Sequence, residues 1–242
     1  MRAIKTILAS AVIGVWSAGA VAAPIIVDDF STGSDNGFQQ IPGFIPDSGQ
    51  VGGGGILGGF RDVQVGGNAT GLVGTRATAS GGVFAFSNDT GVTGDVLITW
   101  DGDDSPTVLD PLGLGGVDLT SGGFNDAFRL DVLTSDLAGL QLTIHVHTDA
   151  GNSSSQSITI GTAVNGGLMQ DFLFTNFTPT AGGGADFANV GAIQLYVTGP
   201  AEIDATFDLV GVLDTTPVPV PASLPLMVAG LAGVALVSRS RR

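Results

Sequence analysis

The strongest constraint on the fold of this chain is an alternation of side chains between residues 140 and 147. Leu140, Leu142, Ile144 and Val146 are apolar, and the residues between them are polar. A period of two marks a β-strand with one buried and one solvated face, because successive side chains of a strand point to opposite sides. The same alternation recurs in three further windows, at residues 128–132, 193–197 and 205–209.

Shorter candidate strands lie between glycine-rich segments. The chain holds 39 glycines, and glycine disfavours helices because it loses the most backbone entropy on folding. The segment 149–152 has the composition of a hairpin loop, and the glycine-rich stretch 52–68 is expected to form an ordered, turn-rich connection. Together these signals predict an all-β antiparallel β-sandwich. The shorter candidate strands are residues 25–30, 83–86, 96–100, 157–160 and 171–177.

Residues 1–22 have the organisation of a secretory signal peptide. Arg2 and Lys5 precede an apolar stretch, and Ala20 and Ala22 supply the small residues of a cleavage site. The alternative is an uncleaved anchor helix, but the apolar stretch is short for a hydrocarbon core of about 30 Å. We therefore expect cleavage after Ala22.

The C-terminal segment, residues 215–242, has the character of a second membrane-directed signal. It is uncharged up to residue 237, and only residues 226–237 are free of proline and suited to a helix. Twelve helical residues cover about 18 Å, which is short of a full span. Arg239, Arg241 and Arg242 follow and are expected to stay on the cytoplasmic side. The alternative is a buried C-terminal helix of a soluble domain.

The order of these C-terminal elements resembles the sorting signal of PEP-CTERM proteins. The match comprises a proline-rich motif, a short apolar helix and an arginine cluster, with Val220 where the type motif has glutamate. In that class an exosortase, which is a membrane protease-transpeptidase, recognises the tail in bacteria that make exopolysaccharide. The resemblance implies an exosortase partner, transient contact with the inner membrane, and a place in the cell envelope, on the cell surface or outside the cell. The motif residues are Val218, Pro219, Val220, Pro221 and Ala222.

The segment between the two signals, residues 23–214, has the length of one β-sandwich domain and is strongly acidic. It keeps three arginines against all 22 acidic residues of the chain, a net charge of −19. Such a charge argues against nucleic acid or anionic lipid as a partner, because both are polyanions.

This body also resembles the galactose-binding-like jelly rolls of carbohydrate-binding modules. The resemblance rests on residues 26–30, 117–120 and 186–190. It implies a β-sandwich, and in such folds a structural Ca²⁺ often joins the first strand to the last. By that resemblance, Asp28 or Asp29 with Asp208 are the candidate ligands.

A second acidic cluster favours calcium on chemical grounds. Asp101, Asp103 and Asp104 place three carboxylates within four residues, and Asp28 and Asp29 form another pair. Ca²⁺ prefers such oxygen ligands and is available outside the cell. The alternative for residues 101–104 is a solvated acidic turn.

The chain offers few groups for catalysis or for other metals. His145 and His147 share one strand face with Asp149, and they are either a Zn²⁺ or Cu²⁺ site or ordinary polar residues of the solvated face. Glu202, the single glutamate, lies in an expected turn and is the candidate acid of a glycan hydrolase. We expect no enzymatic activity.

Aromatic side chains that could stack on a sugar are scarce. Tyr196 alternates outward in its strand and is the candidate ligand contact, whereas Trp100 shares the face of Val96 and Ile98 and is expected in the core. The sequence thus favours an exported, exosortase-sorted surface or matrix protein with a non-catalytic body, associated with exopolysaccharide in a biofilm. The alternative is a carbohydrate-binding module or a glycan-active envelope enzyme on the same fold. Assembly through exposed strand edges is a third possibility.

Overall fold

The structure is a computed structural model that describes residues 23–32, 38–39, 48–67, 73–103 and 105–215. These residues fall within one compact unit, Ala22–Thr215. The expected signal peptide with Ala20 and Ala22, the sorting motif from Val218 to Ala222, and Arg239, Arg241 and Arg242 lie outside the described residues. Within the described ranges, no helix is long and apolar enough to cross a membrane.

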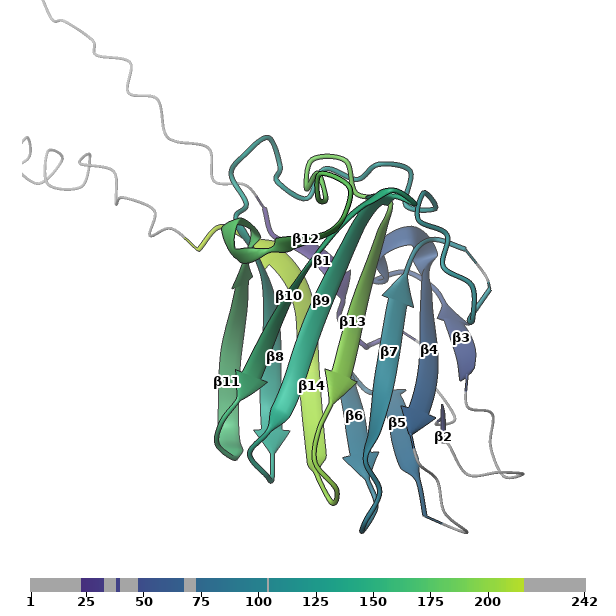
Figure 1. The fold of residues 1–242 in the computed structure, drawn as a ribbon, viewed down its shortest axis with the longest axis vertical. Helices are drawn as coiled ribbons and strands as arrows, with labels where there is room; N and C mark the ends of the chain where they lie inside the picture. The colour runs from purple at the N-terminus through teal and green to yellow at the C-terminus, as the bar shows by residue number, and fades with distance from the viewer. Residues whose placement is uncertain (1–22, 33–37, 40–47, 68–72, 104, 216–242) are drawn as a thin grey trace, which may run out of the picture. The chain divides into compact units, whose positions relative to one another are not determined.

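Two antiparallel sheets face each other and confirm the predicted β-sandwich (Figure 1). One, the β8 sheet, runs in the order β11 (Val164–Leu173), β8 (Ala127–Ser135), β14 (Asp204–Leu213), β6 (Val83–Asn88), β5 (Thr75–Ser80) and β2 (Phe38–Gln39), with β1 (Ile25–Asp28) beside β14. The other, the β9 sheet, runs in the order β12 (Thr178–Ala181), β10 (Asn152–Ile160), β9 (Leu140–Asp149), β13 (Ala192–Thr198), β7 (Gly94–Trp100), β4 (Phe60–Gly67) and β3 (Ser48–Gly52).

The apolar positions of the alternating strands form the core between the sheets. Leu140, Leu142, Ile144 and Val146 of β9 are all buried, as the period of two predicts. Trp100 is fully buried, which confirms its expected place in the core. The largest side chains packed there with it include Phe84, Phe86, Phe128, Phe172 and Phe207.

The glycine-rich first half contains more strand than the sequence predicts. Of the stretch 52–68 the structure describes residues 52–67, most of which belong to β3 and β4, joined by a turn and the 3-10 helix η1 (Leu57–Gly59). The predicted strand at 171–177 is wrong beyond Leu173, where the 3-10 helix η2 (Phe174–Asn176) leads the chain across to β12 in the other sheet. Phe174 still continues the β11–β8 register, because its backbone N–H donates to the carbonyl of Asp126, and the chain turns away only with the bond from Phe177 N–H to the Phe174 carbonyl.

The described chain enters and leaves the sandwich at one end. Ile25 of β1 pairs with Val212 of β14 in an antiparallel register. Beyond β14, the Asp126 carboxylate accepts hydrogen bonds from the backbone N–H and the hydroxyl of Thr215, both at 2.8 Å. The first and last strands are therefore neighbours, and the last described residue is fixed to the body.

Candidate functional site

The outer face of the β9 sheet carries polar side chains in rows that cross the strands. The cross-strand registers place Thr99 of β7 opposite Gln194 of β13, and Gln194 opposite His145 of β9. The next row, one pleat along the strands, has Tyr196 at its centre between Leu97 and Thr143. We call the side chains of these rows that point away from the core the polar face; Asp62 and Thr99 among them are buried. The polar face comprises Asp62, Gln64, Asp95, Leu97, Thr99, Gln141, Thr143, His145, His147, Ser155, Ser157, Thr159, Gln194, Tyr196 and Thr198.

Hydrogen bonds tie the polar face together across four strands, β7, β13, β9 and β10. The Gln194 Nε2 atom donates to Thr99 Oγ1 at 3.1 Å, and its Oε1 lies 3.3 Å from Nε2 of His147. Thr143 and Ser157 share a hydrogen bond of 2.8 Å between their hydroxyls. Hydroxyl, amide and imidazole groups are thus held in fixed positions on a rigid sheet.

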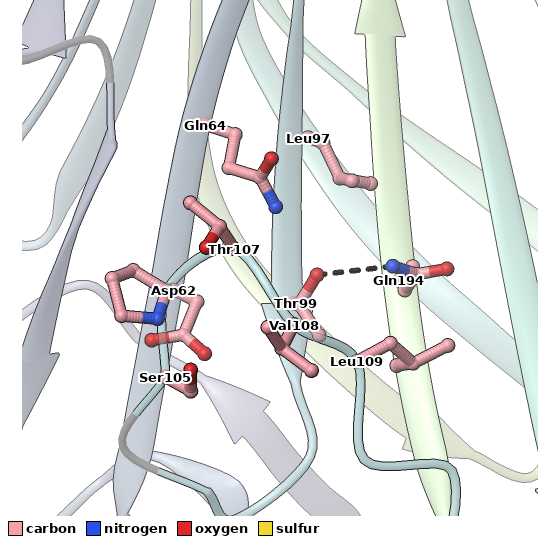
Figure 2. A pocket seen from close by; sticks show the side chains of 10 residues that line it. Asp62, Gln64, Leu97, Thr99, Ser105, Thr107, Val108, Leu109 and Gln194 are labelled. Atoms are coloured by element: carbon pink, nitrogen blue, oxygen red, sulfur yellow. Dashed lines mark hydrogen bonds between the residues drawn. The ribbon is translucent and has the colours of Figure 1, made fainter.

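A loop between β7 and β8 projects over this face and encloses a cavity of about 230 Å³ (Figure 2). The floor is formed by Asp62 and Gln64 of β4, Leu97 and Thr99 of β7, and Gln194 of β13. The wall is the loop segment from Ser105 to Leu109. One part of the polar face therefore forms the floor of a recess, and the loop segment forms its wall.

Asp101 sets the course of this loop. Its side chain is fully buried, and its two oxygens accept the backbone N–H groups of Asp103 and Asp110, at 3.1 Å and 2.8 Å. Burial raises the pKa of the Asp101 carboxyl, because desolvation penalises its charged form. Gln50 of β3 adds a side-chain hydrogen bond to the carbonyl of Asp103. The loop wall is therefore pinned at the edge of the sheet.

Tyr196 lies in the middle of the polar face, on the outward side predicted from its strand. Its side chain is partly exposed, at 36%. Partial burial and the neighbouring Asp95 carboxylate, which it also contacts through a hydrogen bond, raise the pKa of its phenol. A ring with one accessible side and a neutral hydroxyl combines an apolar stacking surface with a polar contact.

His145 and His147 lie on the polar face, with ring centroids 6.5 Å apart and planes inclined by 17°. Burial lowers the pKa of both imidazoles, so they are neutral at pH 7. Asp149 does not complete a metal set with them, because its carboxylate accepts from Gly151 and Asn152 in the hairpin turn. Among the described residues, no three His, Asp or Glu side chains are grouped so that they could hold a metal ion.

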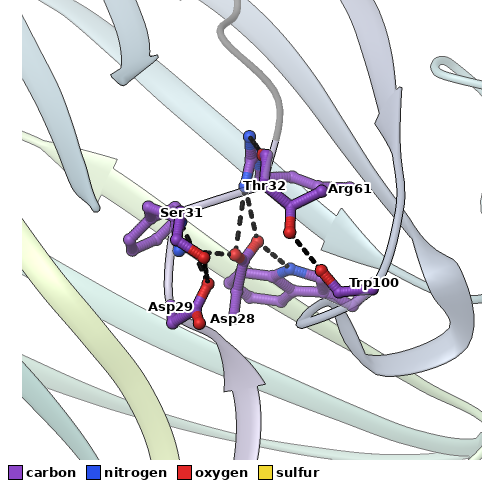
Figure 3. A network of polar contacts seen from close by, with 8 residues as sticks. Asp28, Asp29, Ser31, Thr32, Arg61 and Trp100 are labelled. Atoms are coloured by element: carbon purple, nitrogen blue, oxygen red, sulfur yellow. Dashed lines mark hydrogen bonds and ion pairs between the residues drawn. The ribbon is translucent and has the colours of Figure 1, made fainter. Parts of the chain in front are cut away.

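Asp28 belongs to a buried ion pair and does not fit a calcium site (Figure 3). Arg61 Nη1 lies 3.0 Å and 2.9 Å from the two oxygens of Asp28, and both side chains are fully buried. Trp100 Nε1 donates to Oδ2 at 2.9 Å, and the backbone N–H of Phe30 donates to Oδ1 at 2.8 Å. Since guanidinium, indole and amide N–H groups occupy both oxygens, the expectation that Asp28 binds Ca²⁺ is corrected. The cation of this site is Arg61.

The other predicted calcium ligands do not gather around Asp28. Asp29 accepts from the backbone and hydroxyl of Ser31 in a local turn. Asp208 follows Phe207, whose side chain is buried in the core, and its charge raises the pKa of Asp131 on β8. Asp103 follows Asp101 in the β7–β8 loop, and Asp104 lies outside the described residues.

The remaining acidic candidate, Glu202, lies in the turn between β13 and β14 with a backbone φ of +68°. This position confirms the predicted turn.

Several residues of the site escaped the sequence analysis. The cavity is lined by four such residues, Asp62, Gln64, Thr99 and Gln194. Another is Arg61, the cation of the buried ion pair with Asp28. The sequence did contain one indication that Arg61 is buried. Arg61 alternates with Val63 and Val65, so it lies on the same inward face of the strand. The neighbours β7, β13 and β9 are not consecutive in the chain, so their shared face is visible only in the fold.

Known proteins resemble this chain in fold. No protein-family model matches it, and neither does any curated protein sequence. The family 11 carbohydrate-binding module of the cellulosomal cellulase Lic26A-Cel5E of Clostridium thermocellum is 11% identical, covers 82% of this chain and 99% of its own, and has a TM-score of 0.38. The family 30 module of the cellulosomal cellulase Cel9D-Cel44B of the same organism is 11% identical, with coverages of 79% and 98% and a TM-score of 0.39. A third structure, TmCBM61 in complex with β-1,4-galactotriose, is 11% identical, with coverages of 63% and 88% and a TM-score of 0.31. The likeness is one of fold.

Proposed function

We propose that the sandwich is a non-catalytic domain that binds a neutral polysaccharide on the polar face. The observation that carries this proposal is the set of cross-strand rows around Gln194 and Tyr196. Part of these rows forms the floor of the cavity under the Ser105–Leu109 segment. Sugars are recognised by hydrogen bonds to hydroxyls and by stacking on aromatic rings, and the rows supply both within one rigid surface.

The charge of the face supports a neutral ligand. Its charged groups include Asp62 and Asp95, whereas the three arginines of the body lie elsewhere, with Arg61 in the interior and Arg76 and Arg129 on the β8 sheet. A uronate- or sulfate-bearing polymer would meet a body of net charge −19 and no arginine on this face. A neutral polymer meets hydroxyls, amides and neutral imidazoles.

Affinity electrophoresis of the purified chain tests this proposal. Native gels that contain agarose, galactan or mixed-linkage β-glucan are expected to retard the chain, and gels that contain alginate are not. Tyr196→Ala should reduce retardation, since it removes the exposed aromatic ring on which a sugar can stack. The matched control is Phe124→Ala, because Phe124 is also an exposed aromatic side chain, at 51%, but lies in a loop. Equal retardation of the two variants, or none for the parent chain, contradicts the proposal.

The same proposal places the domain outside the inner membrane. Its support is the sequence pattern of residues 1–22 and 215–242, in which positive charges flank apolar segments at both ends. An exosortase-type enzyme would then sort the chain to the surface or matrix of a bacterium that makes exopolysaccharide, and the bound polymer would be a component of that biofilm matrix. Deletion of residues 217–242 is expected to move the protein to a different cell fraction while the sandwich still folds. Identical fractionation of the deleted and full chains would contradict sorting.

A further inference from the structure

One asparagine of the described residues is followed directly by glycine, and it lies in the edge strand β11 as Asn165–Gly166. An asparagine side chain can react with the backbone nitrogen of the next residue, because its amide carbon lies within reach of that nitrogen. The approach is least obstructed before glycine, which has no Cβ. Asparagine is for this reason one of the thermolabile residues of proteins. The sequence at residue 165 therefore permits a covalent modification, and the fold decides whether it occurs.

The fold keeps this peptide unit exposed and outside a regular ladder. Asn165 and Gly166 are both exposed. Gly166 and Gly167 adopt φ values of +102° and +88°, and the register with β8 shifts between Asn165 and Leu168, so neither glycine has a partner in that register. None of the described residues pairs with the other side of β11. Residues of such a bulge are not held by ladder hydrogen bonds, so their backbone opens at low free-energy cost.

The surroundings of the bulge leave room for a rearrangement. Apart from the adjacent residues, no heavy atom lies within 4 Å of the Cβ position of Gly166 or of Gly167. The two glycines also line a recess of about 280 Å³. Among the described residues, none forms a hydrogen bond with the side-chain amide of Asn165. This amide can therefore rotate toward the nitrogen of Gly166.

The other described asparagines each lack one of these conditions. Two are buried, one is held by hydrogen bonds to Asp149 and Gly183, and two are exposed but precede a phenylalanine or a valine. In that order they are Asn88, Asn125, Asn152, Asn176 and Asn189. Aspartate before glycine can form the same ring, but the carboxylate of Asp101, which precedes Gly102, is buried and accepts two N–H groups.

From these features we propose that Asn165 deamidates spontaneously in the folded chain. The backbone nitrogen of Gly166 forms a bond to Cγ of Asn165, the bond from Cγ to Nδ2 breaks, and the proton of the attacking N–H leaves with Nδ2 as ammonia. Water then opens the resulting succinimide ring at one of its two carbonyl carbons. Opening at one carbon gives aspartate, and opening at the other gives isoaspartate, in which the main chain runs through the former side chain. Water is the only co-reactant.

The products differ from Asn165 in charge and in backbone length. Either product adds a negative charge, because its carboxyl is ionised at neutral pH. Isoaspartate also lengthens the backbone by one methylene opposite Thr134, the last regular partner of β11 before the register shifts. Since the ladder is already interrupted at this point, the modified sandwich is expected to stay folded.

Incubation of the full chain in buffer, followed by isoelectric focusing and peptide mapping, tests the proposal. The sequence contains a second Asn-Gly pair, Asn36–Gly37, outside the described residues, so Asn36→Gln serves as the parent chain. This parent is expected to accumulate forms that are more acidic by one charge, faster at pH 9 than at pH 7 because the attacking nitrogen must lose its proton. Peptide mapping should locate aspartate and isoaspartate at residue 165. A parent chain that keeps its charge, or that is modified only at other residues, would overturn the proposal.

Two further variants assign the acidic forms to Asn165. Asn165→Gln should abolish them, because the longer side chain has to close a less favourable six-membered ring. The matched control is Asn189→Gln, since Asn189 is also exposed but precedes Val190, and it should leave the rate unchanged. Equal rates for these two variants contradict the proposal.

A synthetic peptide of residues 161–171 measures the reaction without the fold. We expect Asn165 of the folded chain to react no more than about tenfold more slowly than the peptide, which corresponds to an opening cost of at most about 1.4 kcal/mol. Circular dichroism during the incubation verifies that the chain remains folded. A folded chain that reacts far more slowly than this limit would show that the bulge protects Asn165.

Discussion

Two polar regions of this protein are built from consecutive residues of the same two strands. On β4, Arg61 points inward to the buried ion pair and Asp62 outward to the cavity; on β7, Trp100 points inward and Thr99 outward. The inward region is closed, because Arg61, Trp100 and a backbone amide occupy both oxygens of Asp28. The outward region is only partly covered: Asp62 and Thr99 are themselves buried, but Gln194 beside Thr99 is partly exposed and Tyr196 is exposed. Strand alternation therefore separates the buried ion-pair network from the proposed binding surface by one residue.

Arg61→Met should have the largest effect of any substitution considered. It leaves the Asp28 carboxylate buried without its ion partner, which typically costs about 3–5 kcal/mol of unfolding free energy. Urea denaturation of the folded chain measures this loss. The control is Arg76→Met, whose pair with Asp89 is at the surface and should contribute less than about 1 kcal/mol. Equal losses for the two variants would remove the distinction between the buried network and a surface ion pair.

Asp101→Asn tests the support of the cavity wall. The amide can accept only one of the two backbone N–H groups that the carboxylate accepts, so we expect a loss of about 1–3 kcal/mol in unfolding free energy. Because the Ser105–Leu109 segment depends on this anchor, polysaccharide binding should weaken as well. A variant with unchanged stability and unchanged retardation would show that Asp101 does not position the loop.

Gln194→Ala should separate binding from stability. The substitution removes the contacts to Thr99 and His147 at the centre of the polar face, and we expect affinity to fall about tenfold, or about 1.4 kcal/mol. The unfolding free energy should change by less than about 1 kcal/mol, since solvent-facing substitutions have small effects. A large loss of unfolding free energy with unchanged binding would show that Gln194 stabilises the fold and does not contribute to ligand binding.

The pH profile of binding gives a smaller effect. Because burial lowers the pKa of His145 and His147 below the ordinary value of 6.5, both imidazoles stay neutral from pH 8 to about 6.5. Binding should be flat across that interval and should decline only as the pH falls further and the rings become charged. The stability contributed by these histidines is also present above pH 6.5 and is lost below it, so a melting curve at each pH serves as the control. A decline that begins above pH 7 would exclude the histidines as its cause.

The smallest expected effect is that of calcium on stability. The Asp28 and Asp101 carboxylates already accept N–H groups, so millimolar Ca²⁺ should change the melting temperature of the chain by less than about 1 °C. A melting scan with Ca²⁺ and one with EDTA measure the difference. A clear rise with Ca²⁺ would restore the acidic loop at residues 101–104 as a cation site.

The sequence was most informative where alternation was strong. The period of two in β8, β9, β13 and β14 predicted each strand and the outward side of Tyr196. It was least informative in β5, where alanine and threonine replace the large apolar residues that mark a strand, and in β4, where an inward arginine and two terminal glycines obscure the alternation of Val63 and Val65. The partner of Asp28 was missed because Arg61 lies 33 residues away on the opposite sheet, and a carboxylate alone does not reveal which cation it meets.

The attachment of Thr215 to Asp126 has a mechanical consequence. A force that pulls on the C-terminal segment reaches the sandwich at Thr215 and then runs lengthwise along β14. β14 is an interior strand, bonded to β8 on one side and to β6 and β1 in succession on the other. The pull therefore shears these ladders together, and does not peel them apart one hydrogen bond at a time. If the domain binds a polymer as proposed, the load between polymer and C-terminal segment passes through an interior strand that is bonded on both sides.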